Sequence, residues 1–202
     1  FRRGQHFCGR VLESVFAYAQ KMKKRTKLWV ALAAAALLSA AFLFGERILP
    51  AVKVEGEKLA YADFFNVKGG LVQSSDLQKE AVSEVVLEEG VIEAFVEDAL
   101  VKAELQKKGI GEAEVTAFLF GNVTREELDK LNEATGKIYG WSVPEFEGYV
   151  LMPQARRIML VQALQKENKN PDEWLKNAKK EARVSIYLPR WKWENGAVEG
   201  RY

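Results

Sequence analysis

A charge-free apolar run near the N-terminus constrains this chain more than any other feature. It extends from Leu28 to Phe44, "LWVALAAAALLSAAFLF", and Ser39 is its only polar interruption. An α-helix needs about 17 to 25 residues to cross a bilayer, and this run has the length of a short spanning helix. We therefore expect a transmembrane signal-anchor at residues 28–45.

The charges on either side of the run predict its orientation. Residues 1–27 carry eight Lys and Arg against one Glu, whereas the remainder carries 22 basic and 27 acidic residues. Lys and Arg accumulate on the cytoplasmic side of membrane helices. We therefore expect residues 1–27 to form a basic cytoplasmic head. The chain from about residue 46 is then expected on the extracytoplasmic side of a bacterial cytoplasmic membrane, as a single-pass protein.

A cleavable signal peptide is the alternative interpretation of the same segment. Ser39-Ala40-Ala41 has the small residues of a cleavage site, but Phe42-Leu43-Phe44 continues the apolar run beyond it. The uncleaved anchor is therefore favoured. Met22 begins "MKKRTKLW", which is typical of the start of a signal-anchor protein, so Met22 is a candidate natural start.

The composition excludes several kinds of chemistry from the outer part of the chain. The only Cys, Cys8, and the only His, His6, both lie in the basic head. The outer part therefore has no disulfide, no Cys nucleophile, no His general base and no His/Cys metal site. The acidic pair Glu88-Glu89 is interpreted as a solvated helix face. We therefore expect no catalytic residue, no cofactor, no metal ion and no small-molecule substrate. Nucleic-acid binding is not expected either, since the outer part has no dense stripe of Lys and Arg.

Helical patterns follow one another through the outer part. Ser75 is in position to cap a helix over "SSDLQKEAVSEVVL", and Gly90 is expected to end it. The next segment, "VIEAFVEDALVKAELQKKG", repeats apolar residues with the period of a helix. Lys107-Lys108-Gly109 closes this second helix, with cations near its C-terminus and a Gly just after the cap.

Later helix starts are predicted from capping residues. Residues 124–127 and 142–145 have the spacing of a capping box, and Asn170 precedes a proline as an N-cap does. Pro153 lies inside the helix that begins after Ser142. Because proline removes a helical hydrogen bond, we expect a kink or a break near Met152.

Two short strand patterns stand at the two ends of the helical region. "AVKVEGEKL" alternates like a strand, turns at Glu55-Gly56 and alternates again. "RVSIYLPR" alternates until its proline. An isolated two-stranded hairpin is marginal in water, so the first strand needs a further partner. We expect Val52 and Val54 to lie in a strand that pairs with residues 183–188 and closes a mostly α domain at its two ends.

With these elements in order, the chain resembles the foldases of the SurA, PrsA and PpiD type. "VKVEGEKLAYADF" resembles their opening segment V-x-V-N-G-x-x-I-x-x-x-x-F, with Glu55 where Asn is usual. "YGWSVPEFEGYVLMPQARRIMLVQAL" is similar to a later helix of the family, including its mid-helix proline. The central helix of the family resembles residues 91–115, where the matching positions are Ala103, Gly109, Ile110, Glu114 and Val115.

The resemblance covers about residues 51–188 and implies a SurA-N-like helical domain, placed here at residues 46–190. Such a domain holds unfolded polypeptide outside the cytoplasm. The family's parvulin prolyl-isomerase domain brings two His residues and a run of strands. Between Leu164 and Arg183 there is room for one helix only, and this part of the chain has no His. The resemblance therefore implies a chaperone-like module without isomerase activity.

Some apolar side chains of this domain are expected to bind client polypeptides, while most fill its core. Met and aromatic side chains tolerate varied partners, which suits a surface that takes up unrelated segments. The candidate client-binding residues are Phe118, Phe120, Tyr149, Met152 and Met159.

Two functions from different classes remain open at this point. The first is a membrane-anchored, non-catalytic, chaperone-like protein that binds unfolded polypeptides. The second is an envelope scaffold protein that uses the same fold to dock one dedicated partner. Residues 191–202 are expected to form a C-terminal tail, in which Trp191 and Trp193 pack on the domain, touch the membrane interface or bind client.

Overall fold

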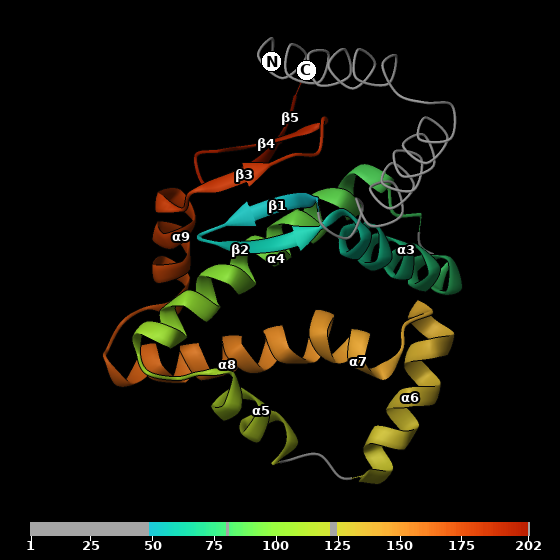
Figure 1. Ribbon diagram of the computed structural model, residues 1–202, viewed down its shortest axis with the longest axis horizontal. Helices are drawn as coiled ribbons and strands as arrows, with labels where there is room; N and C mark the ends of the chain where they lie inside the picture. Colours follow the sequence, from blue (N-terminus) through green and yellow to red (C-terminus); the bar gives the residue numbers. More distant parts are fainter. Residues whose placement is uncertain (1–48, 80, 122–124, 202) are drawn as a thin grey trace, which may run out of the picture. The chain divides into compact units, whose positions relative to one another are not determined.

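The computed structural model describes residues 49–79, 81–121 and 125–201 (Figure 1). The predicted basic head and apolar run, residues 1–45, lie outside the described residues, and so does Thr124 of the predicted capping box. Within the part of the chain that the structure describes, no helix is both long enough and apolar enough to cross a bilayer.

The described chain begins with a β-hairpin. Strands β1 (Pro50–Val54) and β2 (Glu57–Ala60) pair antiparallel, with Val54 opposite Glu57. Between them, Glu55 and Gly56 have φ angles of 47° and 103°. Two successive residues with positive φ form a two-residue hairpin turn, whose twist matches the right-handed twist of the strands on either side. The predicted turn at Glu55-Gly56 is confirmed.

The first strand also pairs with a strand from the far end of the helical region. In β3 (Val184–Ile186), Ile186 lies opposite Val52 and Val184 lies opposite Val54, so the sheet order is β2-β1-β3. Val52 and Val54 are fully buried. The predicted pairing of the two terminal strands is therefore confirmed.

The segment that was expected to be a tail forms a second hairpin. Strands β4 (Trp191–Glu194) and β5 (Ala197–Gly200) pair antiparallel around Asn195 and Gly196, whose φ angles are 53° and 85°. Trp191 is buried, and Trp193 is partly buried against the same apolar cluster. Of the three interpretations of these tryptophans, the structure has the one in which they pack on the domain.

The remainder of the described chain is mostly helical, as the sequence predicts. Its elements are α3 (Tyr61–Gln78), α4 (Glu84–Lys107), α5 (Glu112–Phe120), α6 (Arg125–Tyr139), α7 (Val143–Phe146), the π-helical turn η1 (Glu147–Leu151), α8 (Met152–Lys166) and α9 (Pro171–Glu181). The long helix α4 contacts α3, α8, α9, β1 and β5 (Figure 1). It therefore links the two β-hairpins to α3, α8 and α9.

The predicted boundary between the first two helices is wrong. Ser75 lies inside α3, where its hydroxyl donates to the Val72 carbonyl at 2.9 Å, and Gly90 lies inside α4. The N-cap of α4 is Ser83, whose Oγ accepts a hydrogen bond from the Val86 N–H at 3.3 Å. A helix that had already started at Tyr61 needs no cap at Ser75, because its backbone groups there already have helical partners.

The other capping predictions within the described residues are confirmed. The Glu145 carboxylate accepts a hydrogen bond from the Ser142 N–H at 2.8 Å, which completes a capping box. Asn170 Oδ1 accepts from the Asp172 N–H at 2.9 Å at the start of α9. Gly109 follows the C-terminus of α4 with a φ angle of 76°, a conformation that glycine adopts without a steric cost.

Two apolar clusters form the interior. The sheet cluster joins the three-stranded sheet, α3, the middle of α4 and the second hairpin; its buried members are Ala51, Val52, Val54, Leu59, Phe64, Val91, Ile92, Val96, Ala99, Leu100, Ile186, Leu188, Trp191 and Val198. The helix cluster joins the end of α4 to α5 and α8; its buried members are Val101, Leu105, Val115, Ala155, Leu160 and Leu164. Trp174 of α9 is partly buried against both.

Candidate functional site

Two adjacent hollows lie along α4, where it faces η1, α8 and α9. Their volumes are about 300 Å³ and about 250 Å³. We call the pair the α4 groove. The residues that line both hollows are Ala94, Asp98, Tyr149, Val150 and Pro153.

The larger hollow has an apolar floor and a charged rim. Val101, Leu160 and Leu164 are buried members of the helix cluster and line its base. Trp174 and Leu175 of α9 form one wall. The polar groups around the opening are those of Glu97, Gln154, Arg157 and Asp172. Such a hollow takes up apolar side chains, and its rim contacts the more polar groups beside them.

The smaller hollow continues toward the sheet. Val67 and Leu71 of α3, Leu59 of β2 and Phe95 of α4 line it, together with the buried Trp141. Its surface is mostly apolar and the hollow is open on one side. The two hollows therefore form one apolar strip that follows α4 over about three turns, from Gly90 to Val101.

The wall shared by the two hollows contains the π-helical turn. Proline has no N–H, and its ring would collide with the carbonyl four residues earlier in a regular α-helix. Here the π turn Glu147–Leu151 ends two residues before Pro153, and α8 starts at Met152. Leu151 and Met152 keep helical backbone angles, with φ of −71° and −65°. The irregularity that the sequence predicts near Met152 is thus a wider helical turn, with no break in the helix.

Tyr149, which lies in the π turn, is fixed by polar and aromatic contacts. Its hydroxyl accepts a hydrogen bond from Asn66 Nδ2 at 3.3 Å and donates to Asp63 Oδ1 at 3.4 Å. Its ring meets the ring of Trp141 edge to face, with centroids 5.4 Å apart. Burial raises the pKa of the Tyr149 phenol, so the hydroxyl stays neutral at physiological pH. The side chain is therefore a preformed part of the groove wall.

Asp98 is the acidic group that lines both hollows, and it is paired with Arg156 of α8. Arg156 Nη1 donates to the two carboxylate oxygens at 2.8 Å and 2.6 Å, and its Nη2 donates to Glu112 at 3.1 Å. Burial raises the pKa of Asp98, against the opposing effect of the guanidinium. Because its oxygens already accept hydrogen bonds from Arg156, Asp98 holds α4 to α8 and α5 and is not placed as a free general base.

The structure distributes the five predicted client-binding residues over different surroundings. Tyr149 lines the α4 groove. Phe118, Met152 and Met159 are each partly buried against the helix cluster. Phe120 is the last residue of α5 and is partly exposed. The predicted set is therefore not a single surface, and it contains side chains that support the core.

Sequence reasoning missed most of the groove. Ala94, Val150, Pro153 and Trp174 line it, and they come from three separate segments of the chain. The one signal in the sequence was the mid-helix proline, which marks the irregular turn without indicating what it faces.

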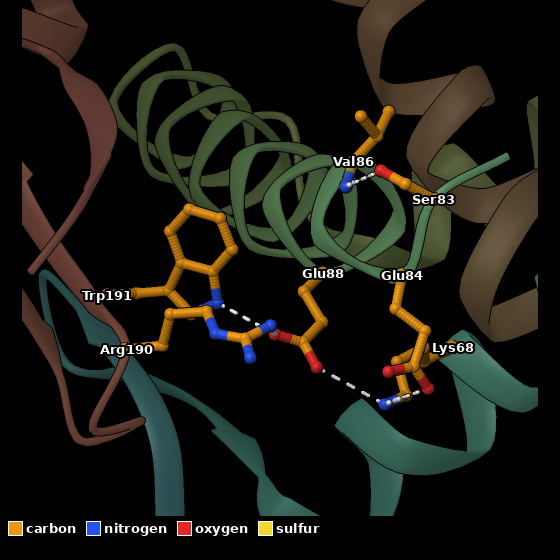
Figure 2. A network of polar contacts seen from close by, with 7 residues as sticks. All are labelled: Lys68, Ser83, Glu84, Val86, Glu88, Arg190 and Trp191. Carbon is orange, nitrogen blue, oxygen red and sulfur yellow. Dashed lines mark hydrogen bonds and ion pairs between the residues drawn. The ribbon is translucent and has the colours of Figure 1, made fainter.

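A polar network around Glu88 fixes the second hairpin to the helices, as Figure 2 shows. Trp191 Nε1 donates to Glu88 Oε2 at 2.9 Å, and Lys68 Nζ lies 3.2 Å from Glu88 Oε1. Burial alone would raise the pKa of Glu88, but the hydrogen bonds from Trp191 and Lys68 bring it below its ordinary value. The interpretation of Glu88 as part of a solvated face is wrong, since its side chain is only 16% exposed.

Comparisons with known protein families, curated proteins and solved structures found no match. In residues 49–79, 81–121 and 125–201, no group of three or more His, Cys, Asp or Glu side chains is arranged to hold a metal ion. What the groove can do chemically therefore follows from its shape and lining: it can take up apolar side chains on a rigid, partly aromatic wall.

Proposed function

We propose that this protein is a membrane-anchored, extracytoplasmic, chaperone-like protein that holds non-native polypeptides in the α4 groove without catalysis. The observation that carries the proposal is the open apolar strip along α4, whose wall is prearranged by Tyr149 and the π turn. Unfolded chains expose apolar side chains that promote aggregation. A strip of this kind covers such side chains until the client buries them by folding.

Membership of the SurA, PrsA and PpiD type of foldases is part of the proposal. It is supported by the order of the matching segments and by the way β1 and β3 join the two ends of a helical domain. The segment between Leu164 and Arg183 contains the end of α8 and the single helix α9. We therefore do not extend the family's isomerase activity to this chain.

The size of the groove predicts weak and unselective binding. Each hollow accommodates a few side chains of a peptide and is smaller than most pockets that enclose a whole ligand. Little surface is buried against a client, and the client must be ordered to fit. We expect affinities of about micromolar, which also permit release.

The proposal is tested by blocking the groove without disturbing the core. Ala94 is exposed, lies on α4 and lines both hollows. In Ala94→Arg, a long charged side chain occupies the strip. Ala113 is an exposed helical alanine on α5, so Ala113→Arg is the matched control for charge and helix propensity. The full chain in detergent or vesicles is mixed with a denatured, aggregating client, and light scattering is followed.

We expect the parent and Ala113→Arg to suppress aggregation at stoichiometric amounts, and Ala94→Arg to lose most of this effect with an unchanged melting temperature. Equal suppression by the two variants would place client binding outside the α4 groove. If the parent suppresses no aggregation, the chaperone proposal fails in favour of a scaffold that docks one partner. The parent and the two variants should all fail to accelerate Xaa-Pro isomerisation, which takes tens to hundreds of seconds uncatalysed.

A further inference from the structure

The outer face of the three-stranded sheet carries an accumulation of positive charge. Lys53 of β1 lies directly opposite Lys58 of β2, and both side chains are exposed. Like charges directly opposite one another destabilise a pair of strands. Across the sheet, Lys53 lies opposite Ser185 of β3, and the exposed Arg183 comes just before that strand. Three cations thus gather on one small surface, at a cost that an anion facing them would remove.

Within the part of the chain that the structure describes, only part of this positive charge is offset. Among the residues that the structure describes, no ion pair joins Lys53, Lys58 or Arg183 to a carboxylate. One acid lies beside them: Glu55 accepts a hydrogen bond from the backbone N–H of Arg183 at 3.1 Å. Its charge offsets one of the three, so the face keeps a positive balance.

The same face contains a hollow with the donors that an anionic headgroup needs. Its volume is about 360 Å³, and its lining residues are Lys53, Glu55, Gly56, Arg183, Ser185 and Tyr187. An ammonium, a guanidinium and two hydroxyl groups therefore border it, together with the single carboxylate of Glu55. Tyr187 is 51% exposed, and tyrosine is enriched where proteins meet the headgroup region of a bilayer. Arginine and lysine bind phosphate groups by charge-assisted hydrogen bonds.

The position of this face in the chain indicates which anion it meets. The apolar run ends at Phe44, and Lys53 follows nine residues later. A fully extended segment of that length spans at most about 30 Å. If the run is anchored as proposed, the segment keeps this face within about 30 Å of the bilayer, so that the field of anionic lipids, which acts over about a Debye length of 10 Å, is within its reach. Leu49, beside the first strand, is 58% exposed.

We propose that the outer face of the sheet, with Lys53, Lys58, Arg183, Ser185 and Tyr187, docks on the anionic phospholipid headgroups of the membrane. This inference rests on the proposed anchor. Docking orients the domain relative to the bilayer. It also restricts the motion of the α4 groove, to which the sheet contributes only Leu59, to a defined range above the surface.

The test uses the full chain in vesicles of phosphatidylcholine alone, or of phosphatidylcholine and phosphatidylglycerol in equal parts. Cys8→Ser removes the native thiol, and Ser185→Cys carries an environment-sensitive dye. A second protein carries the dye at Gln162→Cys, an exposed position on α8. Flotation measures anchoring, and dye emission with lipid-borne quenchers measures docking. We expect flotation with both vesicles, and a blue shift with quenching only at position 185 and only with phosphatidylglycerol.

Charge variants sharpen the result. A cation near an anionic membrane contributes about 1 kcal/mol, so each cation removed should lower the ratio of docked to undocked protein about fivefold. Lys53→Gln with Arg183→Gln should therefore lose docking. Lys176→Gln with Lys180→Gln, which removes two exposed cations from α9, should not. If the first pair changes the melting temperature, Lys53→Gln with Lys58→Gln takes its place.

The outcomes separate this inference from the anchor. Flotation without an emission change on phosphatidylglycerol would overturn the docking surface and leave the anchor intact. Absence of flotation on phosphatidylcholine, with salt-sensitive flotation on phosphatidylglycerol that the Lys53 and Arg183 variant loses, would overturn the anchor and support the docking surface. The same emission change with inorganic phosphate and no vesicles would mean a site for soluble anions and would overturn membrane docking.

Discussion

The sheet cluster and the helix cluster are closed in different ways. The sheet cluster depends on strands from opposite ends of the described chain, because Val52 of β1 packs beside Ile186 of β3. The helix cluster is built from α4, α5 and α8, and Phe118, Met152 and Met159 lie partly buried at its margin. The first is sealed by backbone pairing, and the second only by side chains. We therefore expect the sheet cluster to set global stability and the helix cluster to tolerate local opening.

The largest effect is expected where the sheet cluster is sealed. Val54→Asp places a carboxylate at a fully buried position, which should lower the free energy of unfolding by about 2–4 kcal/mol. Ile186→Asp on the partner strand should do the same. The control is Ser185→Asp, since Ser185 is exposed on the other face of β3. Denaturant unfolding measures the difference. An unchanged melting curve after removal of residues 183–202 would contradict the role assigned to the pairing.

A pair of neighbouring glycines in α3 gives the next effect. A Cβ at Gly70 would lie 2.2 Å from Cε2 of Trp141, whereas one at Gly69 would meet no atom within 4 Å. Gly70→Ala should therefore lower the free energy of unfolding by about 1–3 kcal/mol through overpacking. Gly69→Ala should raise it by about 0.5–1 kcal/mol, because alanine favours the helix. Opposite signs in thermal melts support the packing of Trp141 on α3; equal signs contradict it.

A smaller and more local effect is expected in the helix cluster. Val115 of α5 is 2% exposed, so Val115→Ala should cost about 1–2 kcal/mol. Because α5 is held by side chains alone, we expect faster hydrogen exchange in α5 and little change in β1 and β3. Thr116→Ala, at the exposed position next to it, is the control. Equally faster exchange in the sheet would show that the two clusters open together.

The smallest effect is a dependence on pH at the margin of the helix cluster. Hydrogen bonds from Lys108 and Lys169 lower the pKa of Glu167 from 4.5 to about 2. A carboxyl whose pKa is lower in the folded state stabilises the fold above its unfolded pKa. That stability is lost as the pH falls from about 4.5 to about 2. In Glu167→Gln, the decline of the melting temperature in this window should be shallower. Since Glu167 is exposed, added salt should reduce the difference. A parallel decline in the two proteins would mean that the ion pair adds no stability.

The sequence predicted those features that depend on local or strictly periodic patterns. The alternation around Val52 and around Ile186 predicts two strands, and the residue types at Ser142 and Asn170 predict helix caps. Ser75 was misassigned, because a serine has the chemistry of a cap wherever it stands and only the start of α3 at Tyr61 makes the cap unnecessary. Asn195-Gly196 is a strong turn signal, so the hairpin that the structure has in place of the expected tail is consistent with its local sequence.

The groove was not predictable in the same way. Its wall depends on how the π turn at Tyr149 and Val150 faces Ala94, and these residues are far apart in the chain. A proline in a helix pattern allows a kink, a break or a π turn, which leave the following side chains on different faces. Phe118 and Met159 have side chains of the types that suit a binding surface, yet they pack on the helix cluster. Composition alone does not separate the two roles.

The pairing of β1 with β3 has a consequence for the order of events during synthesis. β1 is made before every helix of the domain, whereas β3 and the hairpin that carries Trp191 are made last. Until then, one edge of β1 remains unpaired. Pairing it with β3 closes a loop that contains all the described helices, and closing so long a loop has an entropic cost. The sheet cluster can therefore be completed only after all the described helices of the domain have been translated. While it is being made, this domain is itself an unfolded polypeptide of the kind that it is proposed to hold.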